Sequence, residues 1–247
     1  MAGMLAGATA LVTGGSGAIG SAICQALASH GAAVAFTYFR HPDKAMALSA
    51  ELEQAGCKCV AGQVDASSAP AVQEFVGRVE SELGRVDVLV NNIGGVQAMP
   101  FALIEEADWD QVISVNLKSL FLFTKAVVRG MIRRRAGVVL NLGSVGGHRL
   151  LEVPVHYATA KAGVTGFTLA LAKELSRYGI RVNEVVPGLI EGGIGNNITE
   201  RQLEDYKKFC TLGRAGRPEE VAELIAFLAS SRAAYINAQS IVVDGGL

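Results

Sequence analysis

The sequence has few cysteines, almost no net charge and no long apolar run. Its four cysteines include one pair a single residue apart and two distant ones, a pattern typical of neither a zinc site nor a disulfide framework; we expect reduced thiols and no metal. A net charge of −1 argues against nucleic-acid binding. Without 18 consecutive apolar residues or a secretion signal, the chain is expected to lie in the cytoplasm and not in a membrane.

Apolar residues and glycine are plentiful, and their order is informative. Half of the 247 residues are apolar, and most of the 29 glycines separate short apolar runs. No linker, repeat or charge block divides the chain, so we expect one domain, 1–247, of the α/β class. Its doubly wound parallel sheet would have about seven strands and helices on both faces. The expected strands are 10–12, 33–38, 58–64, 86–90, 137–142, 181–186 and 240–243. The expected helices are 21–30, 45–55, one from about 70, 108–131, one from Tyr157 to before Gly179, and 218–229.

A glycine-rich turn joins the first strand to the first helix. It reads Thr13-Gly14-Gly15-Ser16-Gly17-Ala18-Ile19-Gly20. Glycines let the backbone approach a pyrophosphate, and the helix N-terminus offers free N–H groups. Such a loop can also be an ordinary turn, but the strand and helix around it predict dinucleotide binding.

The end of the second strand bears on the choice of cofactor. An acid at this place would bind the ribose 2′-hydroxyl of NAD, but the chain has Tyr38-Phe39-Arg40 instead. Arg40 would pair with the 2′-phosphate of NADP, unless it is simply an exposed loop residue. The sequence therefore favours NADP over NAD.

Polar residues follow the third and fourth strands. Asp65 either caps the next helix or lies at the ligand-binding rim of the sheet. Asn91 and Asn92 either brace neighbouring loops or bring the Gly94 backbone to the cofactor. Asn116 lies within a predicted helix, where it would either kink that helix or serve a buried polar relay.

Ser144, Tyr157 and Lys161 form the candidate reactive set. Tyr157 and Lys161 are four residues apart, which places them on one face of a helix, although this spacing is common on ordinary helices. An ammonium beside a phenol would lower the phenol's pKa, and a tuned phenol can transfer a proton to or from a carbonyl oxygen. Ser144 would hold that oxygen.

Taken together, these motifs resemble the short-chain dehydrogenase/reductase family, and most closely its 3-oxoacyl-carrier-protein reductases. The resemblance covers nearly the whole chain and includes Pro187-Gly188 and the terminal Val243-Asp244-Gly245-Gly246. It implies a Rossmann-type domain, usually a homotetramer. It also implies that Tyr157 is the general acid or base, that Lys161 lowers its pKa and binds ribose, that Ser144 orients the carbonyl, and that Asn116 supports proton supply.

The resemblance also extends to binding residues. The residues expected to bind the cofactor are Gly14, Ser16, Gly17, Ala18, Ile19, Gly20, Tyr38, Arg40, Asp65, Asn92, Ile93, Gly94, Tyr157, Lys161, Pro187, Gly188 and Ile190. Basic residues at the mouth of the site would dock an acyl carrier protein, and the matching positions hold Arg129 and Lys173. A substrate or lid loop is expected at about 189–212.

Four positions depart from the family pattern. Ala18 replaces the middle glycine, Gly17 stands where NADP-dependent relatives often have arginine, Ile93 replaces alanine, and Gly192 replaces the threonine that contacts the carboxamide. None of these removes a catalytic group.

Three functions remain open. The first is NADPH-dependent reduction of a β-ketoacyl thioester to the alcohol, and the second is NAD(P)-dependent oxidation of a sugar, steroid or other small alcohol. The third is non-catalytic dinucleotide binding by a regulator on the same fold.

Overall fold

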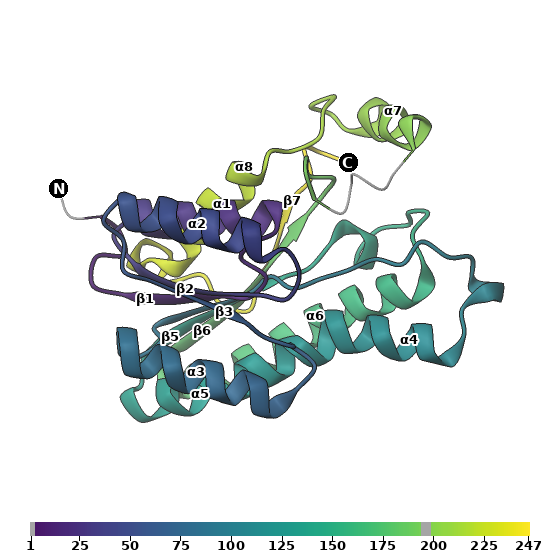
Figure 1. The fold of residues 1–247 in the computed structure, drawn as a ribbon. Coiled ribbons are helices and arrows are strands. Elements are labelled where there is room, and N and C mark those ends of the chain that lie inside the picture. Colours follow the sequence, from purple (N-terminus) through teal and green to yellow (C-terminus); the bar gives the residue numbers. More distant parts are fainter. Residues whose placement is uncertain (1–2, 194–198) are drawn as a thin grey trace.

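The structure, a computed structural model, describes residues 3–193 and 199–247. Its centre is one sheet of seven parallel strands in the order β3-β2-β1-β4-β5-β6-β7 (Figure 1). The strands are β1 (Thr9–Val12), β2 (Ala33–Tyr38), β3 (Cys59–Gln63), β4 (Val88–Asn91), β5 (Gly137–Leu142), β6 (Ile180–Pro187) and β7 (Ser240–Val243). The doubly wound sheet and the seven predicted strands are confirmed.

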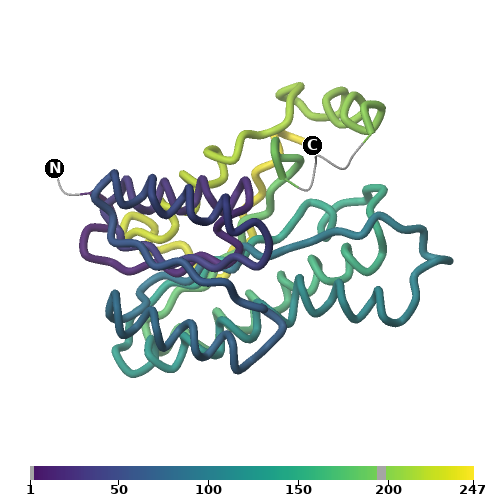
Figure 2. Tube along the Cα trace, viewed as in Figure 1, coloured from purple at the N-terminus to yellow at the C-terminus, as the bar shows by residue number. Residues whose placement is uncertain are grey.

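Helices cover both faces of the sheet. The helices on one face are α1 (Ala18–Ser29), α2 (Pro42–Gln54) and α8 (Pro218–Ala229). Those on the other are α3 (Ala69–Leu83), α5 (Ser119–Arg134) and α6 (Val155–Leu175), with α4 (Glu106–Ile113) extending beyond the sheet. Figure 2 shows that α1 and α8, from opposite ends of the chain, lie side by side.

Two apolar cores lie between the sheet and the helices, one on each face of the sheet. Side chains alternate along a strand, so Ala10 and Val12 of β1 contact one core while Leu11 contacts the other. This explains why the strands are continuous apolar runs, since each is buried from both sides. Packing in these two cores holds the strands in place. The ends of the strands then determine where the loops with the polar residues lie.

The helix predicted over 108–131 is interrupted. A five-residue π-helical segment, η2 (Ser114–Lys118), lies between α4 and α5 and contains Asn116. The combined segment Glu106–Arg134 has the length and composition of a membrane-crossing helix. However, Phe123, Val127 and Met131 are buried in the core beneath the sheet, as in a core helix.

The predicted loop 189–212 is not a loop throughout. Helix α7 (Glu200–Phe209) occupies its second half, beginning at a capping box formed by Thr199 and Gln202. None of its residues is buried, but Leu203, Tyr206 and Phe209 recur at helical spacing, a pattern that the sequence analysis missed. Residues 194–198 of this predicted lid lie outside the described residues.

Candidate functional site

The predicted cofactor-binding loops and Ser144 lie at one edge of the sheet. All seven strands are parallel, so the segments that leave their carboxyl ends meet there. The glycine loop follows β1, Arg40 follows β2, and Asp65 comes two residues after the end of β3. Residues 92–94, Ser144 and residues 188–190 follow β4, β5 and β6 in the same way. The fold thus brings six sequence-distant segments together.

The glycine loop is held in place by the end of β2. The amide of Gly14 donates to Thr37 Oγ1 at 3.1 Å, and that of Gly15 donates to the Thr37 carbonyl oxygen at 2.8 Å. Gly14 has φ +69°, a conformation that favours glycine. Gly17 caps α1 without a side-chain hydrogen bond, which leaves the first N–H groups of α1 available to an anion.

Asn92, the residue directly after β4, braces the same loop. Its Nδ2 donates to the carbonyl oxygens of Thr13 at 3.0 Å and Gly14 at 3.2 Å. A Cβ on Gly20 would collide with the Gly14 carbonyl oxygen and lie 2.9 Å from Asn92 Nδ2. These contacts support the bracing interpretation of Asn92. The backbone of Gly14–Gly20 is packed so closely that Gly20 has no room for a side chain. A close-packed glycine backbone of this kind suits the binding of a pyrophosphate.

Of the neighbouring polar residues, Arg40 and Asp65 are exposed and Tyr38 is half-buried. Tyr38 ends β2, and the exposed Arg40 precedes α2 at the same edge. The Asp65 carboxylate accepts hydrogen bonds from the Ser67 hydroxyl at 2.6 Å and amide at 2.9 Å, which lower its pKa. Ser68 is the N-cap of α3, so the interpretation of Asp65 as that cap is wrong.

Tyr157 and Lys161 lie on one face of α6 and are both buried, with 7% and 3% of their surface exposed. Lys161 Nζ donates to the carbonyl oxygen of Leu142, at the end of β5, at 2.9 Å. A Cβ on Gly94 would lie 3.2 Å from Lys161 Nζ and 3.1 Å from Asn116 Oδ1. The Lys161 ammonium and the Asn116 side-chain amide therefore both lie next to the Gly94 backbone.

The pKa values in this set are governed by burial. Burial raises the pKa of Tyr157, and hydrogen bonding with Ser144 opposes the rise. The net shift of the Tyr157 pKa is upward, opposite to the lowering predicted from Lys161, because the cost of removing a phenolate from water exceeds the effect of the Ser144 hydrogen bond. Burial also lowers the pKa of Lys161 from 10.5 to about 8, against the attraction of Glu184.

Asn116 forms three hydrogen bonds from the π-helical segment. Its Nδ2 donates to the carbonyl oxygens of Gly95 at 2.8 Å and Val112 at 2.9 Å, and its Oδ1 accepts from the Gly95 amide at 3.2 Å. The local distortion expected of a mid-helix asparagine is present. The same contacts hold residues 94–95 beside Lys161.

Two further segments, which follow β5 and β6, complete this edge of the sheet. Ser144 is half-buried, and its Oγ accepts a hydrogen bond from the Gly146 amide at 3.1 Å. Beyond Pro187, the Gly188 amide donates to the Val243 carbonyl oxygen at 2.9 Å, and the buried Ile190 bridges to Gly216. A Cβ on Gly192 would lie 3.2 Å from that of Ala18, so this segment reaches the start of α1.

Arg129 and Lys173 lie far from the reactive set. Lys173 is sixteen residues beyond Tyr157 on α6, which corresponds to roughly 24 Å along the helix. Arg129 lies near the end of α5 that leads into the start of β5, at the opposite edge of the sheet. The prediction that they border the mouth of this chain's own site is wrong, because both helices run away from it.

A groove of about 360 Å³ lies between α3 and α5, and Lys125 and Arg129 line it. None of the four predicted catalytic residues does. Within residues 3–193 and 199–247, no group of three or more His, Cys, Asp or Glu side chains could hold a metal ion.

Several residues at this edge were missed by sequence reasoning. Thr13 Oγ1 accepts from the amides of Asn92 and Ile93, and Thr37 holds the glycine loop. The Tyr206 hydroxyl accepts from the Leu189 amide at 3.1 Å and donates to the Asp244 carbonyl oxygen at 2.9 Å. These leave no sequence signal. Glu184 does, because it is a charged residue in the middle of a strand that the sequence predicts to be buried.

Comparison with known proteins agrees with this geometry. A family profile described as enoyl-(acyl carrier protein) reductase matches residues 14–247. Nodulation protein G of Azospirillum brasilense is 38% identical over 96% of this chain and 97% of its own. The 3-oxoacyl-[acyl-carrier-protein] reductase FabG of Chlamydia trachomatis is 36% identical over 100% of both chains. A solved short-chain dehydrogenase/reductase from Serratia marcescens has a TM-score of 0.93 and 35% identity over 98% of both chains.

Proposed function

The chain belongs to the short-chain dehydrogenase/reductase family and is an oxidoreductase of that family. From this premise we propose that it reduces the ketone of a β-ketoacyl thioester to the secondary alcohol, with NADPH as cofactor. Relatives named 3-oxoacyl-[acyl-carrier-protein] reductase, 36% identical or more over nearly the whole chain, support this substrate class.

The observation that carries the proposal is the buried Tyr157 beside Ser144, with Lys161 one turn away. A raised pKa keeps the phenol protonated at neutral pH, which is the form that a reductase needs in order to donate a proton. Tyr157 donates its proton to the ketone oxygen while Ser144 donates a hydrogen bond to the same atom. Stabilisation of this kind contributes about 3 kcal/mol in comparable sites.

The edge of the sheet fits a dinucleotide. The Gly14–Gly20 cradle and the uncapped N-terminus of α1 would bind the pyrophosphate, and Arg40 would bind the 2′-phosphate. When bound, NADPH supplies the hydride for the carbonyl carbon. Lys161 would bind the nicotinamide ribose, and Asn116 would hold the Gly94–Gly95 segment against it.

A carrier protein remains the proposed source of the thioester. Arg129 and Lys173 would serve this docking only at the site of a neighbouring copy, because both lie far from the reactive set of their own chain. This arrangement requires an oligomer, for which we propose a homotetramer. The segment 189–212 would cover the substrate.

The test is NADPH consumption with three thioesters: a β-ketoacyl group on carrier protein, the same group on coenzyme A, and a trans-2-enoyl group on carrier protein. We expect turnover of the two ketones, with preference for the carrier-bound form. Reduction of the enoyl group alone, or activity only with sugar or steroid alcohols, would overturn the proposal. NADPH binding with no turnover of any carbonyl would indicate the regulator.

A further inference from the structure

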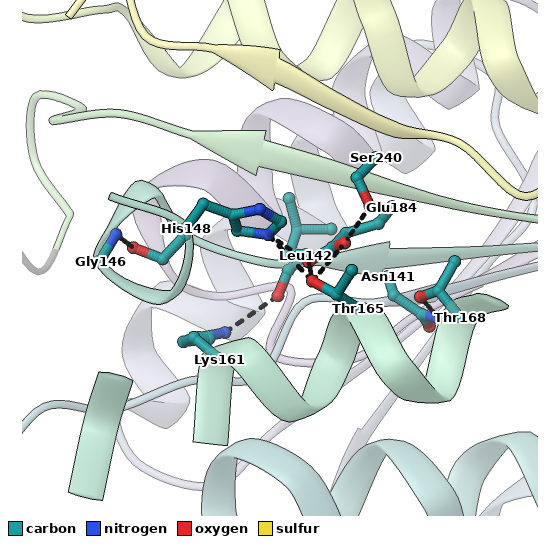
Figure 3. A network of polar contacts seen from close by, with 10 residues as sticks. Asn141, Leu142, Gly146, His148, Lys161, Thr165, Thr168, Glu184 and Ser240 are labelled. Atoms are coloured by element: carbon teal, nitrogen blue, oxygen red, sulfur yellow. Dashed lines mark hydrogen bonds and ion pairs between the residues drawn. The ribbon is translucent and has the colours of Figure 1, made fainter. Parts of the chain in front are cut away.

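A fully buried carboxylate lies behind the reactive residues. Glu184 lies within β6, between the buried Asn183 and Val185, and none of its surface is exposed. Its Oε2 accepts hydrogen bonds from Ser240 at 2.5 Å and Thr165 at 3.0 Å, and its Oε1 lies 3.4 Å from His148 Nε2 (Figure 3). Burying a charge is costly unless the charge is both hydrogen-bonded and paired, so the hydrogen-bonded Glu184 still calls for a positive partner.

The backbone beside this carboxylate carries two of the reactive groups. A Cβ on Gly143 would collide with Glu184 Oε1, so the carboxylate lies directly against Gly143. Gly143 joins Leu142, whose carbonyl oxygen accepts from Lys161, to Ser144. A shift of the Glu184 side chain would therefore reach both the ammonium and the hydroxyl.

Glu184 also acts on the charge of Lys161. Lys161 is buried, and within the described residues it forms no ion pair closer than 4 Å. Glu184 attracts the ammonium electrostatically and opposes the loss of its proton caused by burial. Both groups lie in a low-dielectric interior, where such attraction acts over longer distances than in water.

We propose that Glu184 is a positioning residue that keeps Lys161 protonated and holds the Gly143–Ser144 segment in place for the reaction. The inference rests on the proposed reduction at Tyr157. It assigns a role to a residue that does not touch the substrate.

Other groups around the carboxylate must be considered in a pH experiment. Lys161 faces it from α6, and His148 faces it from the position directly after the turn η3 (Val145–Gly147). Ser240 on β7 does not titrate at these pH values, and Asp244 beyond β7 is paired with Arg149 at 3.0 Å. The experiment uses pH 7.5 to 10, because imidazoles ordinarily titrate below that interval.

The decisive variant is Glu184→Gln, which removes the charge and keeps an oxygen that can accept from Thr165 and Ser240. We expect the alkaline limb of the kcat profile to move to lower pH by about one unit, with the KM for the ketone changed less than kcat. Glu174→Gln, an exposed change on α6, is the charge-matched control and should retain the wild-type profile. An activity loss of the same factor at every pH would overturn the proposal.

A second measurement is independent of turnover. Thermal unfolding at pH 7.5 is compared in the wild type, Glu184→Gln, Lys161→Met and the double variant. We expect Glu184→Gln to lower the midpoint more when Lys161 is present than in the Lys161→Met background, because the attraction requires both charges. If Glu184→Gln lowered the midpoint equally with and without Lys161, the coupling between the two residues would be rejected. This outcome does not depend on which substrate the enzyme reduces.

Discussion

Lys161 reaches from α6 to the end of β5, where its ammonium donates a hydrogen bond to the Leu142 carbonyl oxygen at 2.9 Å. This contact ties the helix that carries Tyr157 to the strand that leads to Ser144. The reactive groups are thereby fixed to rigid elements. Such preorganisation keeps donors in place as charge develops on a substrate oxygen.

Tyr157→Phe should lower the rate of ketone reduction by about a thousandfold, because it removes the proton donor and leaves the shape of the site unchanged. NADPH binding, followed by nucleotide fluorescence, should change little. Tyr235→Phe, a change at an exposed residue, is the control and should retain activity. Normal turnover in Tyr157→Phe would exclude this residue as the acid.

Arg40→Ala should raise the KM for NADPH by about tenfold or more and leave the KM for NADH nearly unchanged. The reason is that only NADPH carries the 2′-phosphate that a guanidinium binds. Initial rates with each cofactor measure the effect, and the exposed Arg232→Ala serves as control. Equal effects on both cofactors would remove Arg40 from the site.

Gly20→Ala and Gly77→Ala test the cradle with matched changes in helices. At Gly20 the new methyl would collide with the Gly14 carbonyl oxygen, so we expect loss of NADPH binding. At Gly77 in α3 nothing lies within 4 Å of an added Cβ, and alanine should stabilise the protein by about 0.5–1 kcal/mol. Titration calorimetry and thermal unfolding measure the two outcomes. Unimpaired binding by Gly20→Ala would count against the cradle.

Lys161 should make stability depend on pH. Its pKa is about 8 in the folded protein and 10.5 in a model peptide, so the unfolded chain binds more protons between these values. Burial of the ammonium therefore costs about 3 kcal/mol below pH 8, and this cost disappears as the pH rises toward 10.5.

Lys161→Met lacks this ionisation. We expect its free energy of unfolding relative to the wild type to be highest at pH 7 and to fall as the pH rises to 10. Denaturant titrations at several pH values measure the difference, which cancels contributions from the cysteines and Tyr157. A difference that is constant across this range would mean that Lys161 is not buried with a lowered pKa.

The sequence by itself determined the alternation of elements. Apolar runs such as 33–38 and 137–142 are buried on both faces, and Gly31, Gly56 and Gly179 end their segments with positive φ, so local chemistry marks these boundaries. It also determined that Tyr157 and Lys161 share a helix face, because that follows from helical periodicity. Helix α7 was missed, although the capping pair Thr199 and Gln202 and the helical spacing of Leu203 and Tyr206 are signals in the sequence.

Only the tertiary structure decided the electrostatics and the distant contacts. The pKa of Tyr157 moves opposite to the predicted direction because burial, which depends on how the chain packs, outweighs the hydrogen bond with Ser144. The distance of Arg129 and Lys173 from the site follows from the direction in which α5 and α6 run. Glu184 meets His148, Thr165 and Ser240 because three other segments pack around β6, a relation that no spacing along the chain encodes.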